Sequence, residues 1–324
     1  MQYDPGCRLV TVKRGSLLKG VALGAVAAGV AAPLLRRRLR ISAPVTITTA
    51  AAAPVALCVA VPRSRARDVG VCLLQMWAYL AAYEMPNDDP DSLEERVHVD
   101  YPVRIDRAIG LGVPPTLRLQ RLFTHPGEIQ GYEKLLVWTH WVWFAVPHTT
   151  VAWVLLRHRD RFPRAAVMTY AVFDIGALCY WLIPTAPPWY AAERGRLEDG
   201  HTPRVRRMMI EYGAQFWRDN WGPLYSSLAG NPLAAMPSLH FATSVMAARI
   251  LSETGPIAGA IGWTYAGTLG VALVYLGEHY VTDLIAGATL AEGVRRSSAR
   301  LDRPARAIGR LIGRLEHRAT GGGR

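Results

Sequence analysis

Apolar residues lie in long blocks along this chain, separated by polar stretches. A membrane hydrocarbon core of roughly 30 Å needs about 20 apolar residues per helix. The blocks predict membrane-spanning helices at residues 17–35, 41–61, 69–85, 135–156, 165–184, 234–251, 257–276 and 280–294. The last six form a predicted core of six helices, and the first two, rich in Ala and Gly, are an extra N-terminal pair whose topology stays open. We therefore expect an all-α integral membrane protein.

Two long polar stretches interrupt the apolar blocks. Residues 86–133 include the string Asn87-Asp88-Asp89-Pro90-Asp91 and further Pro and Gly residues, and residues 191–233 form the second stretch. Such clusters of polar, Pro and Gly residues predict loops, and we expect short interfacial helices in the first loop. The predicted division is a basic and Ala-rich membrane segment at 1–68, a membrane domain with both loops at 69–294, and a basic tail at 295–324.

Charge sets the expected orientation of the helices. The chain has 324 residues, 51% of them hydrophobic, and a net charge of +12. Most of the excess is Arg in short runs between apolar blocks, which orient helices against anionic lipid rather than bind nucleic acid. Placing the runs at 63–67, at 157–164 and in the tail on the cytoplasmic side puts both loops outside. We expect a multi-pass plasma membrane protein.

One basic run conflicts with this orientation. Residues 36–40 carry four Arg side chains and fall outside if both N-terminal blocks cross the membrane. Pro44 and Pro54 lie in the second block, so a re-entrant hairpin at 41–61 would remove the conflict.

The tail has the pattern of an amphipathic helix. Its basic positions recur every four residues, with apolar residues between them: Arg306, Arg310, Arg314 and Arg318, and Ile308, Leu311, Ile312 and Leu315. A basic stripe beside an apolar one is expected of a helix lying on the inner leaflet. A solvated basic tail is the alternative.

Two short strings at the ends of apolar blocks carry candidate chemistry. In Glu278-His279-Tyr280-Val281-Thr282-Asp283, the imidazole and the carboxylate are four residues apart and share one face of a helix. The carboxylate would then fix the tautomer and leave the other ring nitrogen free as nucleophile or base. An interhelical hydrogen bond is the alternative role, although ionisable groups at membrane depth are costly and usually functional.

In Met236-Pro237-Ser238-Leu239-His240, the second imidazole lies at the start of an apolar helix. Helix N-termini offer free N–H groups to a phosphate oxygen, and Ser238 adds a hydroxyl. Simple capping by Ser238 is the alternative. A third string, which runs from Tyr180 to Tyr190, ends a helix with three prolines and an aromatic belt.

The three strings in this order resemble the type 2 phosphatidic acid phosphatase superfamily, and within it the branch containing inositol phosphorylceramide synthases. Pro237-Ser238-x-His240 is similar to the second family signature and His279-Tyr280-x-x-Asp283 to the third. Ala186-Pro187-Pro188-Trp189-Tyr190 is similar to a stretch before the second signature in the synthase branch. The likeness covers residues 130–294.

The resemblance implies a six-helix core of the phosphatidic acid phosphatase type and a phosphohistidine mechanism. His279 would attack phosphorus, Asp283 would hold His279, and His240 would protonate the departing oxygen. The phosphoryl group would pass to water or to the hydroxyl of a second substrate. No metal or other cofactor is expected, and four scattered cysteines, Cys7, Cys58, Cys72 and Cys179, have no metal-binding spacing.

This chain departs from the family pattern in its basic residues. The phosphatase form has an Arg six residues before the nucleophilic His, where this chain has Leu273, and it has a Lys in the first signature that is missing here. The negative charge of a substrate still needs compensation. Arg194 and Arg196 are the first candidates and would bind substrate together with Ser238, Pro187, Pro188, Trp189 and Tyr190. Further candidates in the same loop are Arg204, Arg206, Arg207 and Arg218.

These observations predict an enzyme that transfers a phosphoryl group on a membrane lipid at the extracytoplasmic face. Transfer of a polar phosphoryl head group to an alcohol, which is itself polar or a lipid, is favoured, and a lipid phosphate phosphatase is the alternative. The alternative from another class of protein is a non-enzymatic transporter or scaffold. A transporter is expected to have charged residues along one pathway through the membrane and often two similar halves of the chain. The polar strings gather at one face instead.

Overall fold

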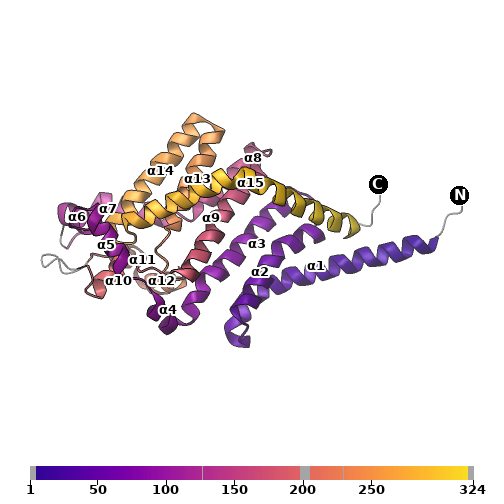
Figure 1. Cartoon of the computed structure of the whole chain (residues 1–324), viewed down its shortest axis with the longest axis horizontal. Coiled ribbons are helices and arrows are strands. Elements are labelled where there is room, and N and C mark those ends of the chain that lie inside the picture. The colour runs from indigo at the N-terminus through magenta and orange to yellow at the C-terminus, as the bar shows by residue number, and fades with distance from the viewer. Residues whose placement is uncertain (1–4, 126, 198–204, 229, 320–324) are drawn as a thin grey trace. The chain divides into compact units, whose positions relative to one another are not determined.

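The structure is a computed structural model, and it describes residues 5–125, 127–197, 205–228 and 230–319. This part of the chain is α-helical, with isolated β-bridges and no strand (Figure 1). The helices are α1 (Pro5–Leu39), α2 (Ala43–Ala60), α3 (Arg65–Glu84), α4 (Pro90–Arg96), α5 (Asp100–Ile109), α6 (Pro115–Phe123), α7 (Gly131–Trp141), α8 (Ala145–Arg157), α9 (Phe162–Leu182), α10 (Pro188–Glu193), α11 (Met208–Trp217), α12 (Trp221–Leu228), α13 (Leu239–Thr254), α14 (Pro256–Tyr275) and α15 (Val281–Ala319), with 3-10 turns at Met85–Asp88 and Arg218–Asn220. The prediction of an all-α membrane protein is confirmed.

Four of the described helices are long and apolar enough to cross a membrane. They cover Gly15–Leu39, Ala43–Ala60, Phe162–Leu182 and Pro256–Tyr275. Each falls on a block predicted to span. Large apolar side chains on them are exposed, among them Leu17, Val45, Leu178 and Ile261. Such exposure is expected of surfaces that face lipid.

The predicted span at 135–156 is not one helix but two, α7 and α8, separated by a turn at residues 142–144. Pro147, in the first turn of α8, favours this break. A proline inside a helix lacks the N–H that would bond to the carbonyl four residues earlier, here that of Trp143, and its ring crowds that carbonyl. The helix therefore ends before Trp143 and restarts in the turn that contains the proline.

The chain divides into two compact units, residues 1–85 with 297–324, and residues 86–296. In the first unit α1, α2 and α3 pack against one another. α2 is a continuous helix through Pro54, so the re-entrant hairpin considered for residues 41–61 is wrong. Pro44 lies in the first turn, where a missing N–H costs nothing. The domain boundaries at 68 and 294 stay a prediction.

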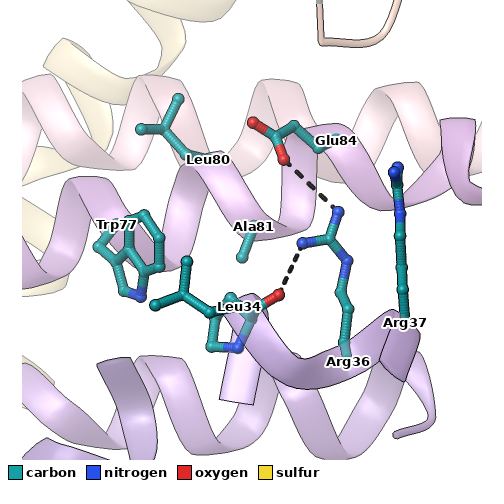
Figure 2. A pocket seen from close by; sticks show the side chains of 8 residues that line it. Leu34, Arg36, Arg37, Trp77, Leu80, Ala81 and Glu84 are labelled. Carbon is teal, nitrogen blue, oxygen red and sulfur yellow. Dashed lines mark hydrogen bonds and ion pairs between the residues drawn. The ribbon is translucent and has the colours of Figure 1, made fainter. Parts of the chain in front are cut away.

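The ends of α1 and α3 meet in this first unit. Arg36 donates to the carbonyl oxygen of Pro33, at 2.9 Å, and lies 3.5 Å from a carboxylate oxygen of Glu84. These residues, with Arg37 and Trp77, line a cavity of about 370 Å³ (Figure 2). The basic run at 36–40 therefore has an acidic partner in Glu84.

The predicted tail helix is the continuation of the last apolar block, because α15 runs without interruption from Val281 to Ala319. Near its end, Glu316 lies 3.0 Å from Arg67 and 3.4 Å from Arg63. These ion pairs hold the tail against the connection between α2 and α3, within the first unit. Its place on the inner leaflet stays a prediction.

In the second unit α13 packs against α14, α8 and α9, and α14 also packs against α7 and α6. The loop predicted at 86–133 contains α4, α5 and α6, and the loop at 191–233 contains α11 and α12. Side chains from both loops form a buried cluster with Tyr280: Val103, Leu117, Ala191, Leu197 and Val205. Both loops therefore pack around the third string.

Candidate functional site

The two imidazoles and the carboxylate predicted from the strings come together in the second unit. Nδ1 of His240 lies 3.0 Å from Nε2 of His279, and Nδ1 of His279 lies 3.3 Å from a carboxylate oxygen of Asp283. His279 is 3% exposed and Asp283 is fully buried. Residues 39 positions apart thus form one hydrogen-bonded chain of side chains.

The order of these contacts limits how the protons are arranged. An ionised carboxylate only accepts hydrogen bonds, and Asp283 also accepts one from the backbone N–H of Tyr280, at 2.9 Å. Nδ1 of His279 then carries the hydrogen that Asp283 accepts. In a neutral ring Nε2 of His279 has the lone pair, so Nδ1 of His240 is the donor of the bond between the rings.

The second string is held at the start of α13. Ser238 is buried and is the N-cap, because its hydroxyl oxygen accepts a hydrogen bond from the N–H of Phe241 at 3.3 Å. Its own N–H donates to the backbone oxygen of Asp283, at 3.0 Å, and the hydroxyl of Tyr180 donates to that of Pro237, at 2.8 Å. The capping role that the sequence left open is present, and substrate binding by Ser238 stays a prediction.

The close packing of α15 on this string requires glycine. A Cβ at Gly287 would lie 2.5 Å from the backbone oxygen of Ser238. Real Cβ atoms do not approach an oxygen so closely, so a larger residue would push α15 away. Gly287 follows Asp283 by four residues and so keeps the carboxylate near His240.

Asp106, on α5, caps the start of α15. Its buried carboxylate accepts hydrogen bonds from the N–H groups of Val281 and Thr282, at 3.2 and 3.0 Å, and from the hydroxyl of Thr282, at 3.2 Å. The first N–H groups of a helix have no partner within it, so this carboxylate satisfies them. Burial raises the pKa of Asp106, and the hydrogen bonds from Thr282 and Val281 oppose the rise.

The proline string lies beside the third string. Pro187 and Pro188 start α10, and the N–H of Trp189 donates to the oxygen of Gly277, at 3.2 Å. Gly277 has a φ of +77°, the left-handed region that favours glycine. The turn between α14 and His279 is therefore tied to Trp189.

The aromatic pair around His240 was not predicted. The ring of His140 lies 4.7 Å from that of His240, centre to centre, and the ring of Trp143 lies 4.1 Å from it. Trp143 is itself anchored, since its Nε1 donates to the hydroxyl of Thr243 at 2.9 Å. The sequence held one signal for this pair, because His140 is an ionisable residue within the apolar block at 135–156.

Arg194 and Arg196, the first candidates for binding phosphate, contact acidic side chains of the first loop. Arg194 pairs with Glu94 at 2.6 Å and Arg196 with Asp100 at 3.8 Å, and all four side chains are at least half exposed. Arg194 also donates to the hydroxyl of Tyr190, at 2.8 Å. The described contacts of both arginines are thus with acidic or aromatic side chains of the loops, and their role in binding substrate stays a prediction.

Arg207 is placed closer to the third string. Its guanidinium lies 3.9 Å from the centre of the Trp189 ring, and its charge acts on the carboxyl of Glu278, the neighbour of His279. Burial raises the pKa of Glu278, and the Arg207 charge opposes this. Arg204, another candidate, lies outside the described residues. Sequence spacing alone did not separate Arg207 from the other loop arginines.

Leu273 occupies the position where the phosphatase pattern has an Arg. Its side chain is fully buried, and its backbone oxygen accepts from the N–H groups of Glu278 and His279, at 3.0 and 3.1 Å. No cation can enter the site from this position. Charge compensation by another element, such as the loop that carries Arg207, stays a prediction.

Comparison with known proteins decides the family. The model of the PAP2 superfamily matches residues 103–294, more than half of the chain. The chain belongs to the PAP2 superfamily. That range contains all three strings, the second loop and residues 103–133 of the first, and it confirms the resemblance seen in the sequence.

A relative carries the likeness further. The phosphoinositol dihydroceramide synthase of Bacteroides thetaiotaomicron is 30% identical over 143 residues. The match covers 42% of this chain and 45% of that protein, so the chain spans less than half the length of this relative. No solved structure matches the chain. Together the family and this relative support a lipid phosphatase or phosphotransferase activity.

Proposed function

We propose that this PAP2 protein transfers the phosphoryl head group of a phospholipid to an acceptor alcohol through a phosphohistidine intermediate. The observation that carries the proposal is the chain of contacts from Asp283 through His279 to His240. It makes the lone pair of Nε2 of His279 and the hydrogen on Nδ1 of His240 partners in one hydrogen bond, so a phosphoryl group that binds there must separate the two rings. A phosphoryl group between the two rings would meet a nucleophile on one side and an acid on the other.

In the first step, Nε2 of His279 attacks phosphorus, and the bond from phosphorus to the glycerol oxygen of the lipid breaks. His240, in its doubly protonated form, gives one proton to that oxygen and becomes neutral, and diacylglycerol leaves. In the second step, the oxygen of the acceptor alcohol attacks phosphorus and the N–P bond breaks. The proton of the acceptor hydroxyl returns to His240, so both steps balance.

Asp283 acts through His279 in this scheme. Its carboxylate holds the ring in the tautomer that attacks and stabilises the positive charge that forms on the ring when the N–P bond is made. The buried position of Asp283 makes this interaction stronger than it would be in water.

Transfer is favoured over hydrolysis by two observations. The relative is a synthase by name, and its name includes phosphoinositol, so we propose a head group such as inositol phosphate. The chain also lacks the cation that the phosphatase pattern places where Leu273 is buried. A phosphodiester carries less negative charge than a free phosphomonoester and needs fewer cations. We further propose that the site opens to the extracytoplasmic face of the plasma membrane.

Incubation with phosphatidylinositol that is labelled in the head group tests this function. The full-length protein in mixed micelles is assayed with and without candidate alcohols, long-chain and short. The proposal expects label in a new product only when an alcohol is present. Release of free inositol phosphate regardless of the alcohol would make the protein a hydrolase, and no turnover above that of the His279→Ala variant would refute phosphoryl transfer.

A further inference from the structure

Glu278 has an acceptor atom that the chain itself does not use. Its Oε1 is shielded from solvent and has no hydrogen-bond partner. A buried polar atom without a partner costs roughly 1–3 kcal/mol, so such atoms are usually satisfied by water or a ligand. Glu278 directly precedes the proposed nucleophile His279 in the chain, in the turn between α14 and α15.

Arg207 offers an unused donor in the same region. Its Nε is buried without a partner, whereas its NH2 donates to the hydroxyl of Tyr225 at 3.0 Å and its NH1 lies 3.8 Å from Glu193. Its guanidinium lies 3.9 Å from the centre of the Trp189 ring, and the N–H of Trp189 donates at 3.2 Å to the oxygen of Gly277, the residue before Glu278. One unused acceptor and one unused donor are therefore near each other, beside His279.

Both groups are on well-fixed backbone. The side-chain oxygen of Gln120 accepts from the N–H of Arg206, at 2.9 Å, and its amide nitrogen donates to the oxygens of Arg206 and Tyr275, at 3.1 and 2.8 Å. These bonds hold the residue before Arg207 against the end of α14. A bound group would meet both side chains in positions that are set in advance.

We propose that Glu278 and Arg207 select the head group of the lipid, with Glu278 accepting a hydrogen bond from a head-group hydroxyl and Arg207 donating one to a head-group or phosphate oxygen. This assignment rests on the proposed function and adds to it the residues that recognise a polyhydroxylated head group.

The aromatic faces of the proline string argue against a quaternary ammonium head group. Such cations are recognised by open aromatic faces. Here the guanidinium of Arg207 covers the ring of Trp189, at 3.9 Å, and that of Arg194 lies over the ring of Tyr190, at 5.0 Å. Each of these two faces already has its own cation, and Arg207 would repel another. An uncharged head group rich in hydroxyls fits both side chains.

The test measures lipid binding in the His279→Ala background, where turnover does not interfere. Displacement of a fluorescent phosphatidylinositol from the full-length protein gives affinities for phosphatidylinositol and phosphatidylcholine. We expect at least about tenfold tighter binding of phosphatidylinositol. Adding Glu278→Met, which removes the acceptor and keeps the volume, should bring the ratio to within about threefold. Glu95→Gln is the matched control on an exposed carboxylate and should leave the ratio unchanged.

A second variant tests Arg207 separately. Arg207→Gln removes the charge and uncovers Trp189, so phosphatidylinositol binding should weaken while phosphatidylcholine binding improves. Equal binding of both lipids by the His279→Ala protein, or an unchanged ratio in both Glu278→Met and Arg207→Gln, would overturn the proposal. Because binding is measured without turnover, these results are distinct from failure of the transfer assay, which would refute the proposed function instead.

Discussion

His240 and His279 are within hydrogen-bond distance of each other, yet the proposed roles make them respond differently to substitution. An acid matters less when the leaving group is already good, whereas the nucleophile is needed whatever leaves. His240→Ala should therefore slow turnover of a natural phospholipid far more than that of a nitrophenyl phosphodiester analogue. His279→Ala should lower both by several orders of magnitude.

Rates of both substrates with purified variants, compared with wild type, check this prediction. Equal losses for the two substrates in His240→Ala would mean that His240 binds phosphate or supports its helix and that the acid is another group. Activity of His279→Ala within about tenfold of wild type would remove His279 as the nucleophile.

At the residue scale, the sequence identified the groups that meet, missed His140 and Asp106, and named Arg207 only as one of several loop arginines. His240, His279 and Asp283 could be selected because each lies at the end of an apolar block, where ionisable side chains are rare. His140, Asp106 and Arg207 come from elements far away in the sequence, and nothing in their local spacing shows where they lie. Arg194 and Arg196 were chosen by their nearness to the proline string, and the fold brings Arg207 to Trp189 instead.

At the scale of the element, the capping of α15 by Asp106 is a test of how the third string is held. Asp106→Ala leaves the first N–H groups of α15 without partners, and loss of such a cap costs about 1–2 kcal/mol. We expect a lower melting temperature in detergent and a fall in turnover. Asp100→Ala is the control, because this exposed carboxylate begins the same helix α5.

The effect on α15 is separable from a general loss of stability. Asp106→Asn keeps an acceptor oxygen for one N–H group and should recover part of the melting temperature. If the melting temperature and the turnover of the Asp106→Ala variant equal those of Asp100→Ala, the cap does not support the site.

The helices themselves were predictable where the apolar block and the helix ends coincide. Residues 257–276 correspond to α14 (Pro256–Tyr275), with Pro256 at its start. The block at 135–156 was misjudged because hydropathy ignores backbone geometry, and Pro147 divides it. The tail was expected as a helix of its own, but α15 continues from residues 280–294 into the tail and runs past both Gly293 and Pro304.

At the scale of the whole molecule, the basic runs predict which loops face the cytoplasm. In a variant with all native cysteines replaced, a cysteine at Asp91 should react with an impermeant thiol reagent added to intact cells. A cysteine at Asp160, beside the basic connection between α8 and α9, should react only after the membrane is opened. Both positions are exposed, so reactivity reports sidedness. The reverse pattern would move the loops and the proposed site to the cytoplasmic face.

The most direct measurement of the central claim is detection of the covalent intermediate. Purified protein is mixed with phosphatidylinositol without an acceptor alcohol, quenched under alkaline conditions in which phosphohistidine survives, digested and analysed by mass spectrometry. The account predicts a phosphoinositol adduct on the peptide that contains His279, which is lost in His279→Ala and is discharged when an alcohol is added before quenching. Turnover of the lipid with no adduct on His279 at any time would contradict it.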